Sequence, residues 1–182
     1  MLGFEKPGKH NTDAVVETVL KRAAELGKPS IVVASNTGDT ALKFAGKGFP
    51  VVCVTHVTGF KEPGDDEMGP ERRTHLAEKG VKVFTGTHLF GGIGRACRLK
   101  HGGVYPDEIV ADTLRTFGQG IKVCVEVAVM ALDAGLVPYG EPVISIGGTG
   151  RGADAAVVVE PSHAKEFFKT KVLEVLCKPK KF

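Results

Sequence analysis

The sequence lacks long apolar runs, a leader-like N-terminus and any large excess of charge of one sign. Its longest unbroken apolar segment is too short to cross a bilayer, and its N-terminus does not show the basic-then-apolar order of a signal peptide. We therefore expect a cytoplasmic protein with no membrane partner. The net charge is only +3 and no basic stripe with interleaved aromatic residues is present, so we expect no nucleic-acid partner.

Paired cysteines are also missing. The cysteines are Cys53, Cys97, Cys124 and Cys177, without a CxxC pair, so a disulfide framework is not expected. Cys97 and His101 lie four residues apart, close to one helical repeat, but no further ligands lie near them in the sequence. The sequence therefore predicts no metal site.

The chain contains enough apolar material for one core. It has 182 residues, of which 42% are hydrophobic, and it shows neither an internal repeat nor a linker. We therefore expect residues 1–182 to form a single domain.

Strand and helix patterns alternate along the first half of the chain. Short apolar runs predict strands at Ile31–Ala34, Val51–Val54 and Val81–Phe84. Helices are expected at Thr12–Leu26, at Thr40–Lys47 and from Pro70 to the residues before Gly80. Such alternation favours right-handed βαβ crossovers and therefore a parallel sheet.

The second half of the chain is less regular. The segment Ile121–Leu132 alternates in part like a strand, but its length favours a buried helix. Pro142–Ile146 and Ala155–Val159 predict two further strands. The second of these should run antiparallel to the first, because the connection between them is too short for a helical crossover. Val172–Leu176 is either an edge strand or a short helix.

The most informative stretch is the loop Ser35–Thr40, which follows a predicted strand directly and leads into a predicted helix. Amides at a helix N-terminus lack partners and carry a partial positive charge, so such a loop can hold a phosphate-sized anion. Gly38 lets the backbone approach the anion closely. The expected side-chain donors are Ser35, Asn36, Thr37 and Thr40. An ordinary helix cap is the alternative, and Asp39 is expected to cap the helix and to face away from the anion.

A second loop of the same kind, Gly147–Gly152, follows the strand Pro142–Ile146. Its four glycines permit a close backbone approach to a ligand, and arginine suits bidentate phosphate recognition. The alternative is a hairpin connection that needs positive φ angles. We favour ligand binding, with the residues Gly147, Gly148, Thr149 and Arg151.

The segment Thr55–Gly59 lies just past the carboxyl end of another predicted strand, where ligands of open α/β sheets collect. Thr55 and His56 are therefore candidate binding residues. His56 could donate to a phosphate, stack on a ring, or act as a general acid or base near neutral pH. The alternative, which the sequence leaves open, is that His56 only ties down its loop.

The order of elements, with Ser35-Asn36-Thr37-Gly38-Asp39-Thr40-Ala41 after the first predicted strand, resembles the C-terminal α/β domain of pyruvate kinase. The likeness extends from about Thr12 to Glu160. In that domain a Ser/Thr-rich loop ahead of a helix holds one phosphate of the allosteric sugar bisphosphate. A glycine-rich loop similar to Gly147–Asp154 closes the same pocket, and a strand similar to Val51–Val54 ends in a threonine, here Thr55.

More closely, the chain resembles a stand-alone family of archaeal and bacterial proteins built on this domain. Members carry Asn-Thr-Gly-Asp-Thr and Val-Thr-His-Val-Thr-Gly, here Asn36–Thr40 and Val54–Gly59. The resemblance implies a three-layer α/β/α sandwich on a mixed, mostly parallel five-stranded sheet whose last strand is antiparallel. It also implies flavin mononucleotide (FMN) as a ligand and, through the kinase domain, subunit contacts in a homo-oligomer.

These expectations leave several functions open. The sequence has no room for the barrel domain in which pyruvate kinase performs its chemistry. We therefore expect a binding protein for a small phosphorylated cofactor, with FMN as the first candidate. An enzyme is the alternative, either a flavin-dependent oxidoreductase or a hydrolase of small phosphate esters, with His56 as general acid or base. A third alternative is a regulatory module that senses a sugar phosphate.

Overall fold

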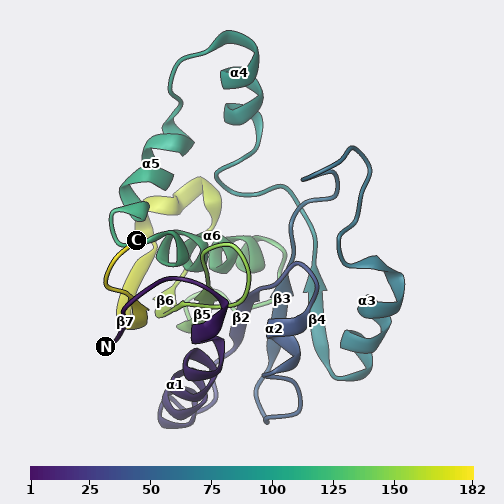
Figure 1. The fold of residues 1–182 in the computed structure, drawn as a ribbon, viewed down its shortest axis with the longest axis vertical. Coiled ribbons are helices and arrows are strands. Elements are labelled where there is room, and N and C mark those ends of the chain that lie inside the picture. Colours follow the sequence, from purple (N-terminus) through teal and green to yellow (C-terminus); the bar gives the residue numbers. More distant parts are fainter.

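The sheet at the centre of the molecule has seven strands, in the order β1-β7-β6-β5-β2-β3-β4 (Figure 1). The computed structural model describes all residues from 1 to 182. The strands are β1 (Leu2–Phe4), β2 (Ile31–Ala34), β3 (Val51–Val54), β4 (Val81–Phe84), β5 (Val143–Gly147), β6 (Ala155–Glu160) and β7 (Lys171–Pro179). The five strands predicted without an alternative are confirmed, each to within one residue at either end.

The strand directions also follow the prediction for the central part of the sheet. β2, β3, β4 and β5 are parallel, and β2 lies between β3 and β5. β6 runs antiparallel to β5, as the short connection between them predicted. β7 is antiparallel to β6, and β1 pairs in parallel with β7.

The expected count of five strands was wrong, because β7 and β1 extend the sheet at one edge. β7 shows that the segment Val172–Leu176 is part of a strand. β1 has only three residues, and its register pairs Leu2 with Cys177 near the other end of the chain. A three-residue strand carries almost no periodic signal, so only the long-range pairing reveals it.

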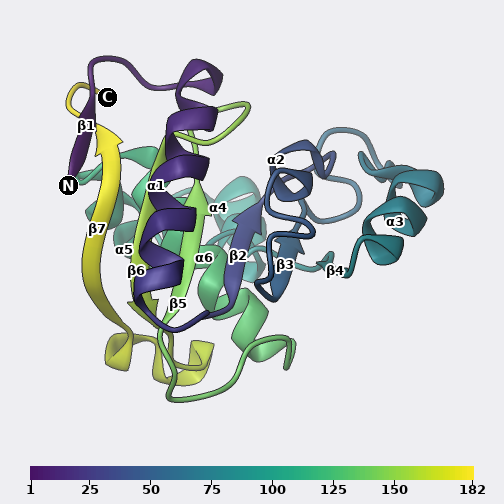
Figure 2. The same ribbon diagram turned by 90° about the horizontal axis from the view of Figure 1, so that it is seen from below.

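Helices cover both faces of the sheet. They are α1 (Thr12–Glu25), α2 (Asp39–Leu42), α3 (Gly69–Glu78), α4 (Ile93–His101), α5 (Pro106–Arg115) and α6 (Gln119–Asp133), with 3-10 helices η1 (Lys9–Asn11) and η2 (Ala164–Lys169). One buried cluster joins α1, α2 and α3 to residues such as Val33, and the other joins α6 to residues such as Val32. In Figure 2, α1 lies in front of the sheet and α6 lies behind it. The predicted three-layer α/β/α sandwich is confirmed.

The ambiguous segment Ile121–Leu132 is helical and lies within α6. Almost all of its residues are buried, because the helix is packed against the sheet on one side and against α5 and η2 on others. A helix that is buried on all sides has no polar face, so the hydrophobic pattern of α6 does not show the helical period. The alternation of its valines is a coincidence.

α2 is shorter than the predicted helix Thr40–Lys47. After Leu42 the chain continues in tight turns, in which the Phe44 amide donates to the Ala41 carbonyl at 3.0 Å. The ring of Phe44 is fully buried in the core, and the turns bring it there. A helix of four residues has few aligned peptide dipoles, so α2 contributes less to anion binding than the sequence indicated.

The segment from α4 to α5 projects away from the sheet (Figure 1). α4 has no buried residue, and Ile93 and Leu99 are 80% and 76% exposed. Within this segment α4 packs closely against α5, because a side chain on Gly94 would overlap the carboxyl group of Asp107. None of the helices has both the length and the apolar character needed to cross a membrane.

Candidate functional site

The strand order reverses between β2 and β5. The chain passes from β2 to β3 and β4 through α2 and α3 on one face, and returns through α6 on the other face to β5. Ligands of open α/β sheets bind at the carboxyl ends of the strands where such a reversal occurs. The loops Ser35–Thr40 and Gly147–Gly152 follow these two strands, and the pairing of Val33 with Ile146 brings the loops side by side. We call this place the switch point.

The Ser35–Thr40 loop is held by backbone contacts at the switch point. The Ser35 amide donates to the Val54 carbonyl at 2.9 Å, and the Thr40 amide donates to Ser35 Oγ at 3.3 Å. Gly38 has a φ of 83°, and a Cβ there would lie 2.6 Å from Leu76 of α3. The packing of α3 therefore accounts for this glycine without any ligand, and Ser35 serves as an internal cap of the loop.

Three side chains of this loop remain available to a ligand. Asn36, Thr37 and Thr40 make no side-chain hydrogen bond within the protein, and Thr37 is exposed. Asp39 does not cap the helix as expected. Its carboxylate instead pairs with Arg72 of α3 at 3.1 Å.

The Gly147–Gly152 loop contains a buried hydroxyl without a partner. Thr149 Oγ1 is buried and makes no hydrogen bond, although the Thr149 amide donates to Asp154 Oδ2 at 3.1 Å. Buried polar atoms are nearly always paired, so such an orphan needs an explanation. Arg151 is exposed and forms no ion pair, which leaves its guanidinium free at the rim of the loop.

Asp154 holds this loop in place, and sequence reasoning missed it. Its side chain is fully buried, and Oδ2 also accepts from the Gly8 amide at 2.8 Å. Its other oxygen lies where a Cβ on Gly120, in the first turn of α6, would come within 2.6 Å. The protein's own carboxylate therefore occupies the N-terminal end of α6.

The next loop along the sheet edge holds His56. His56 Nδ1 lies 2.7 Å from Glu67 Oε1, and Lys61 Nζ lies 2.7 Å from Glu67 Oε2. Burial opposes the charge on Glu67, but the hydrogen bonds from Lys61 and His56 outweigh it and lower the pKa of this carboxyl. Since His56 Nε2 has no partner, the carboxylate orients the ring and leaves one nitrogen free.

Thr55 is turned inward. Its Oγ1 lies 2.5 Å from Thr85 Oγ1 and donates to the His56 carbonyl at 2.8 Å. Arg73 of α3 donates to Thr85 Oγ1 at 2.7 Å. The Thr55 hydroxyl thus connects the ends of β3 and β4, whereas the His56 ring is partly exposed.

His88 belongs to the same group and was not singled out from the sequence. Its Nε2 accepts from the Val57 amide at 3.3 Å, and its ring lies 5.4 Å from that of His56. Burial lowers the pKa of His88, and the charge of Lys122 adds to this effect while Glu126 opposes it. The signal was present, because His88 follows the strand Val81–Phe84 at the same edge of the sheet as His56.

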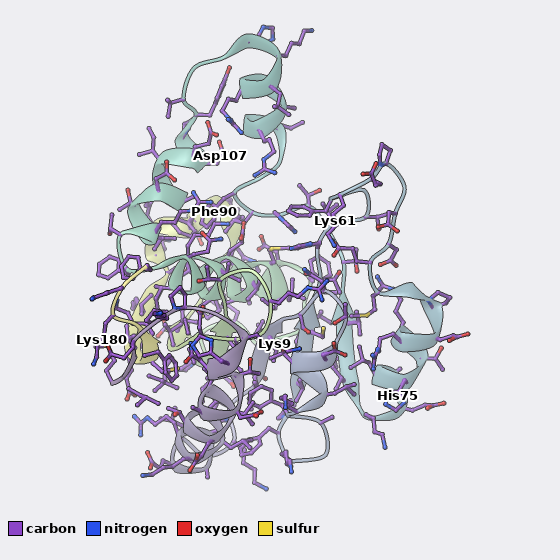
Figure 3. The ribbon with its side chains drawn as sticks, in the orientation of Figure 1. Lys9, Lys61, His75, Phe90, Asp107 and Lys180 are labelled. Atoms are coloured by element: carbon purple, nitrogen blue, oxygen red, sulfur yellow. The ribbon has the colours of Figure 1, made fainter.

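A buried ion pair on α6 lies close to His88. Lys122 Nζ and Glu126 Oε2 form a short ion pair, and both residues are buried. Glu126 Oε1 accepts from the Phe90 amide at 3.1 Å, and the ammonium lies 5.2 Å from the centre of the Phe90 ring. Figure 3 shows Phe90 and Lys61 on the side of the molecule from which α4 and α5 project.

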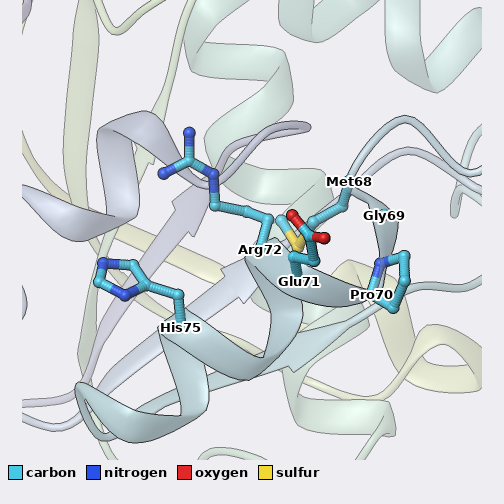
Figure 4. A pocket seen from close by; sticks show the side chains of 6 residues that line it. All are labelled: Met68, Gly69, Pro70, Glu71, Arg72 and His75. Carbon is cyan, nitrogen blue, oxygen red and sulfur yellow. The ribbon is translucent and has the colours of Figure 1, made fainter.

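A cavity in the surface lies elsewhere. It measures about 470 Å³, opens widely to solvent and is lined at the start of α3 by Met68, Gly69, Pro70, Glu71, Arg72 and His75 (Figure 4). Only one of its lining residues is apolar, whereas binding pockets are mostly apolar, so its size does not make it the binding site. No cluster of three or more histidine, cysteine, aspartate or glutamate side chains could hold a metal ion.

Comparison with known protein families agrees with this architecture. The family described as "Pyruvate kinase, alpha/beta domain" matches residues 13–159. A pyruvate kinase of Cryptosporidium parvum, solved in complex with ADP, is similar with a TM-score of 0.42 and 14% sequence identity. That match covers 94% of this chain but only 25% of the kinase chain. Because the family match spans most of its residues, the chain belongs to the family of the pyruvate kinase α/β domain.

Proposed function

We propose that this protein binds a small phosphorylated cofactor at the switch point, with FMN as the first candidate. The observation that carries the proposal is the buried, unpartnered hydroxyl of Thr149 beside the free donors of the Ser35–Thr40 loop. A phosphate supplies several strong acceptor oxygens, which is what these groups lack.

The residues at the switch point fit a phosphate better than a neutral group. Asn36, Thr37, Thr40 and Thr149 supply donors, and Arg151 supplies a free positive charge. Ser35 and the glycines set the backbone of the two loops rather than donate. When bound, a flavin would supply one- and two-electron redox chemistry, while the chain itself would hold and orient it.

Removing the switch-point hydroxyls should weaken the binding of FMN far more than the binding of riboflavin. The variant Thr37→Ala/Thr149→Val loses two donors to a charged phosphate, each worth about 1.5–3 kcal/mol, so we expect FMN affinity to fall at least about 100-fold. Riboflavin has no phosphate, and its affinity should stay within about twofold. Titration followed by flavin fluorescence measures both.

Thr113→Ala, an exposed threonine on α5, is the matched control and should bind both flavins as the parent protein does. Equal weakening of FMN and riboflavin by the double variant would show that the phosphate is not held at the switch point.

An enzymatic function is the second candidate, and the pair of His56 and Glu67 favours it. A carboxylate that orients one nitrogen of a histidine and leaves the other free is a common acid–base arrangement. It would serve a flavin-dependent oxidoreductase or a phosphate-ester hydrolase. The sugar-phosphate sensor rests on likeness of fold alone and comes third.

If the protein hydrolyses phosphate esters, His56→Ala should abolish phosphate release while leaving the binding of inorganic phosphate intact. Glu67→Gln should reduce the rate by about 10- to 100-fold, because the ring loses its orienting charge. Lys61→Met removes the other contact of Glu67 and should have a smaller effect. Release of phosphate from a substrate panel measures all three variants, and unchanged release by His56→Ala would exclude His56 from the reaction.

A further inference from the structure

Three aromatic rings form a cluster at the ends of β3 and β4. The ring centre of His56 lies 3.9 Å from that of Phe60, and His88 lies 5.2 Å from Phe60. We call these three residues the aromatic cluster. Phe60 is 41% exposed, although it lies in a loop that is otherwise polar and rich in acids and glycine. One face of an apolar ring is thus left in water at the functional edge of the sheet.

Hydrogen bonds hold the two histidines of the aromatic cluster and the loop that carries Phe60. The Val57 amide fixes His88, and Glu67 fixes His56. The Gly59 amide donates to the Asp65 carbonyl at 2.8 Å, which closes the loop that carries Phe60. A preformed surface loses little conformational freedom when a ligand settles on it, so binding there costs less than binding to a mobile loop.

The strands that lead into the aromatic cluster and into the phosphate donors are spaced as a mononucleotide requires. Backbone bonds continue past the strand ends, from Ser35 to Val54 and from Thr55 to Phe84, so the loops stand side by side as the strands do. Neighbouring strands are about 4.8 Å apart, which places the end of β3 roughly 10 Å from the end of β5. A ribose or ribityl linker spans such a distance between a phosphate and a ring.

His88 adds a directed hydrogen-bond donor. Its Nε2 accepts from a backbone amide, so the neutral ring carries its proton on Nδ1. No group of the protein accepts from Nδ1. Burial lowers the pKa of His88 and favours this neutral form at neutral pH. The free donor suits a carbonyl oxygen on the edge of a planar ring.

We propose that the aromatic cluster is the subsite for the ring of the ligand, with Phe60 stacking on its face and His88 Nδ1 donating to a carbonyl oxygen on its edge. This inference rests on the phosphate site proposed above. It narrows the ligand class to phosphate esters that carry an aromatic ring with carbonyl groups, such as flavin or pyrimidine nucleotides. Sugar phosphates, which have no aromatic ring to stack on Phe60, are excluded as the preferred ligand.

The test is a titration of the whole chain with FMN, riboflavin, uridine monophosphate, uridine and inorganic phosphate. Phe60→Ala should lower the affinity for each ring-bearing ligand that the parent protein binds by about tenfold, because stacking on an aromatic side chain is lost. This loss should be the same for ligands with and without a phosphate. The affinity of this variant for inorganic phosphate should not change. Phe60→Trp, which keeps a stacking surface, should bind as the parent protein does.

Phe168→Ala is the matched control, since Phe168 is 89% exposed on η2, outside the loops at the switch point. Unchanged binding of the ring-bearing ligands by Phe60→Ala would overturn the ring subsite, as would an equal loss in Phe168→Ala. A parent protein that binds inorganic phosphate but none of the four ring-bearing ligands would also overturn it. Loss of FMN affinity in Phe60→Ala but not in Thr37→Ala/Thr149→Val would instead overturn the phosphate site and leave the ring subsite standing.

Discussion

Raising the pH from neutral to about 10.5 is expected to lower the free energy of unfolding by about 4–6 kcal/mol, through three buried thiols. Cys53, Cys124 and Cys177 are fully buried. Burial raises the pKa of Cys53 to about 12 and that of Cys177 to about 12, and it raises the pKa of Cys124 well above the ordinary value. Each thiol therefore keeps its proton in the folded protein after the unfolded chain has released it.

The sign follows from the number of bound protons. Between about pH 9 and about pH 12 the unfolded state binds fewer protons than the folded state, so stability falls as the pH rises. At about pH 10.5 Cys53 and Cys177 each account for about 2 kcal/mol, and Cys124 acts in the same direction. Burial lowers the pKa of Lys122, which works in the opposite direction, but it is one group against three.

Urea unfolding under reducing conditions, at neutral pH and at about pH 10.5, measures this loss. The double variant Cys53→Ala/Cys177→Ala should reduce the difference in the free energy of unfolding between the two pH values by about 4 kcal/mol, even though it lowers stability at both. Cys97→Ala controls for oxidation of a more accessible thiol. A pH dependence that is the same in the double variant and in the parent protein would rule out the buried thiols as its cause.

Replacing Lys122 with methionine is expected to lower the free energy of unfolding by about 3–5 kcal/mol. Lys122 and Glu126 are both buried, so the variant leaves a carboxylate in the interior without its counter-charge. The ammonium also lies near the ring of Phe90, and that contact is lost as well. Chemical unfolding monitored by circular dichroism measures the change.

The double variant Lys122→Met/Glu126→Gln should recover most of this loss, because it removes both charges. The amide oxygen of glutamine still accepts from the Phe90 amide, which otherwise would be buried without a partner. Lys43→Met is the control, because it breaks an exposed ion pair with Asp13 that is worth at most about 1 kcal/mol. The buried pair would be unimportant if Lys122→Met cost no more than Lys43→Met.

Much of the candidate site could be predicted because it depends on local sequence. Each of the strands β2, β3 and β5 is a short apolar run, and the polar residues after it must emerge at the carboxyl edge of the sheet. The loops Ser35–Thr40 and Gly147–Gly152 and the residue His56 were identified in this way. The antiparallel direction of β6 followed from loop length alone.

Other features depend on contacts between distant residues. Asp154 accepts from Gly8, and Glu67 reaches back to His56 from the far end of a long loop. The length of α2 was overestimated because good helix formers continue to Ala45, whereas the core draws Phe44 inward and Gly46 adopts a φ of 69°. Tertiary packing overrides local propensity at such places.

The sequence by itself determined the alternation of strands and helices, the parallel centre of the sheet and the positions of the loops that follow its strands, because these follow from hydrophobic period and turn chemistry. Only the tertiary structure decided that β1 and β7 complete the sheet, that Thr149 is left without a partner and that His56, Phe60 and His88 meet. The physical reason is that a hydrogen bond or a ring contact between distant residues leaves no periodic trace in the chain. It forms only when the whole core has brought those residues together.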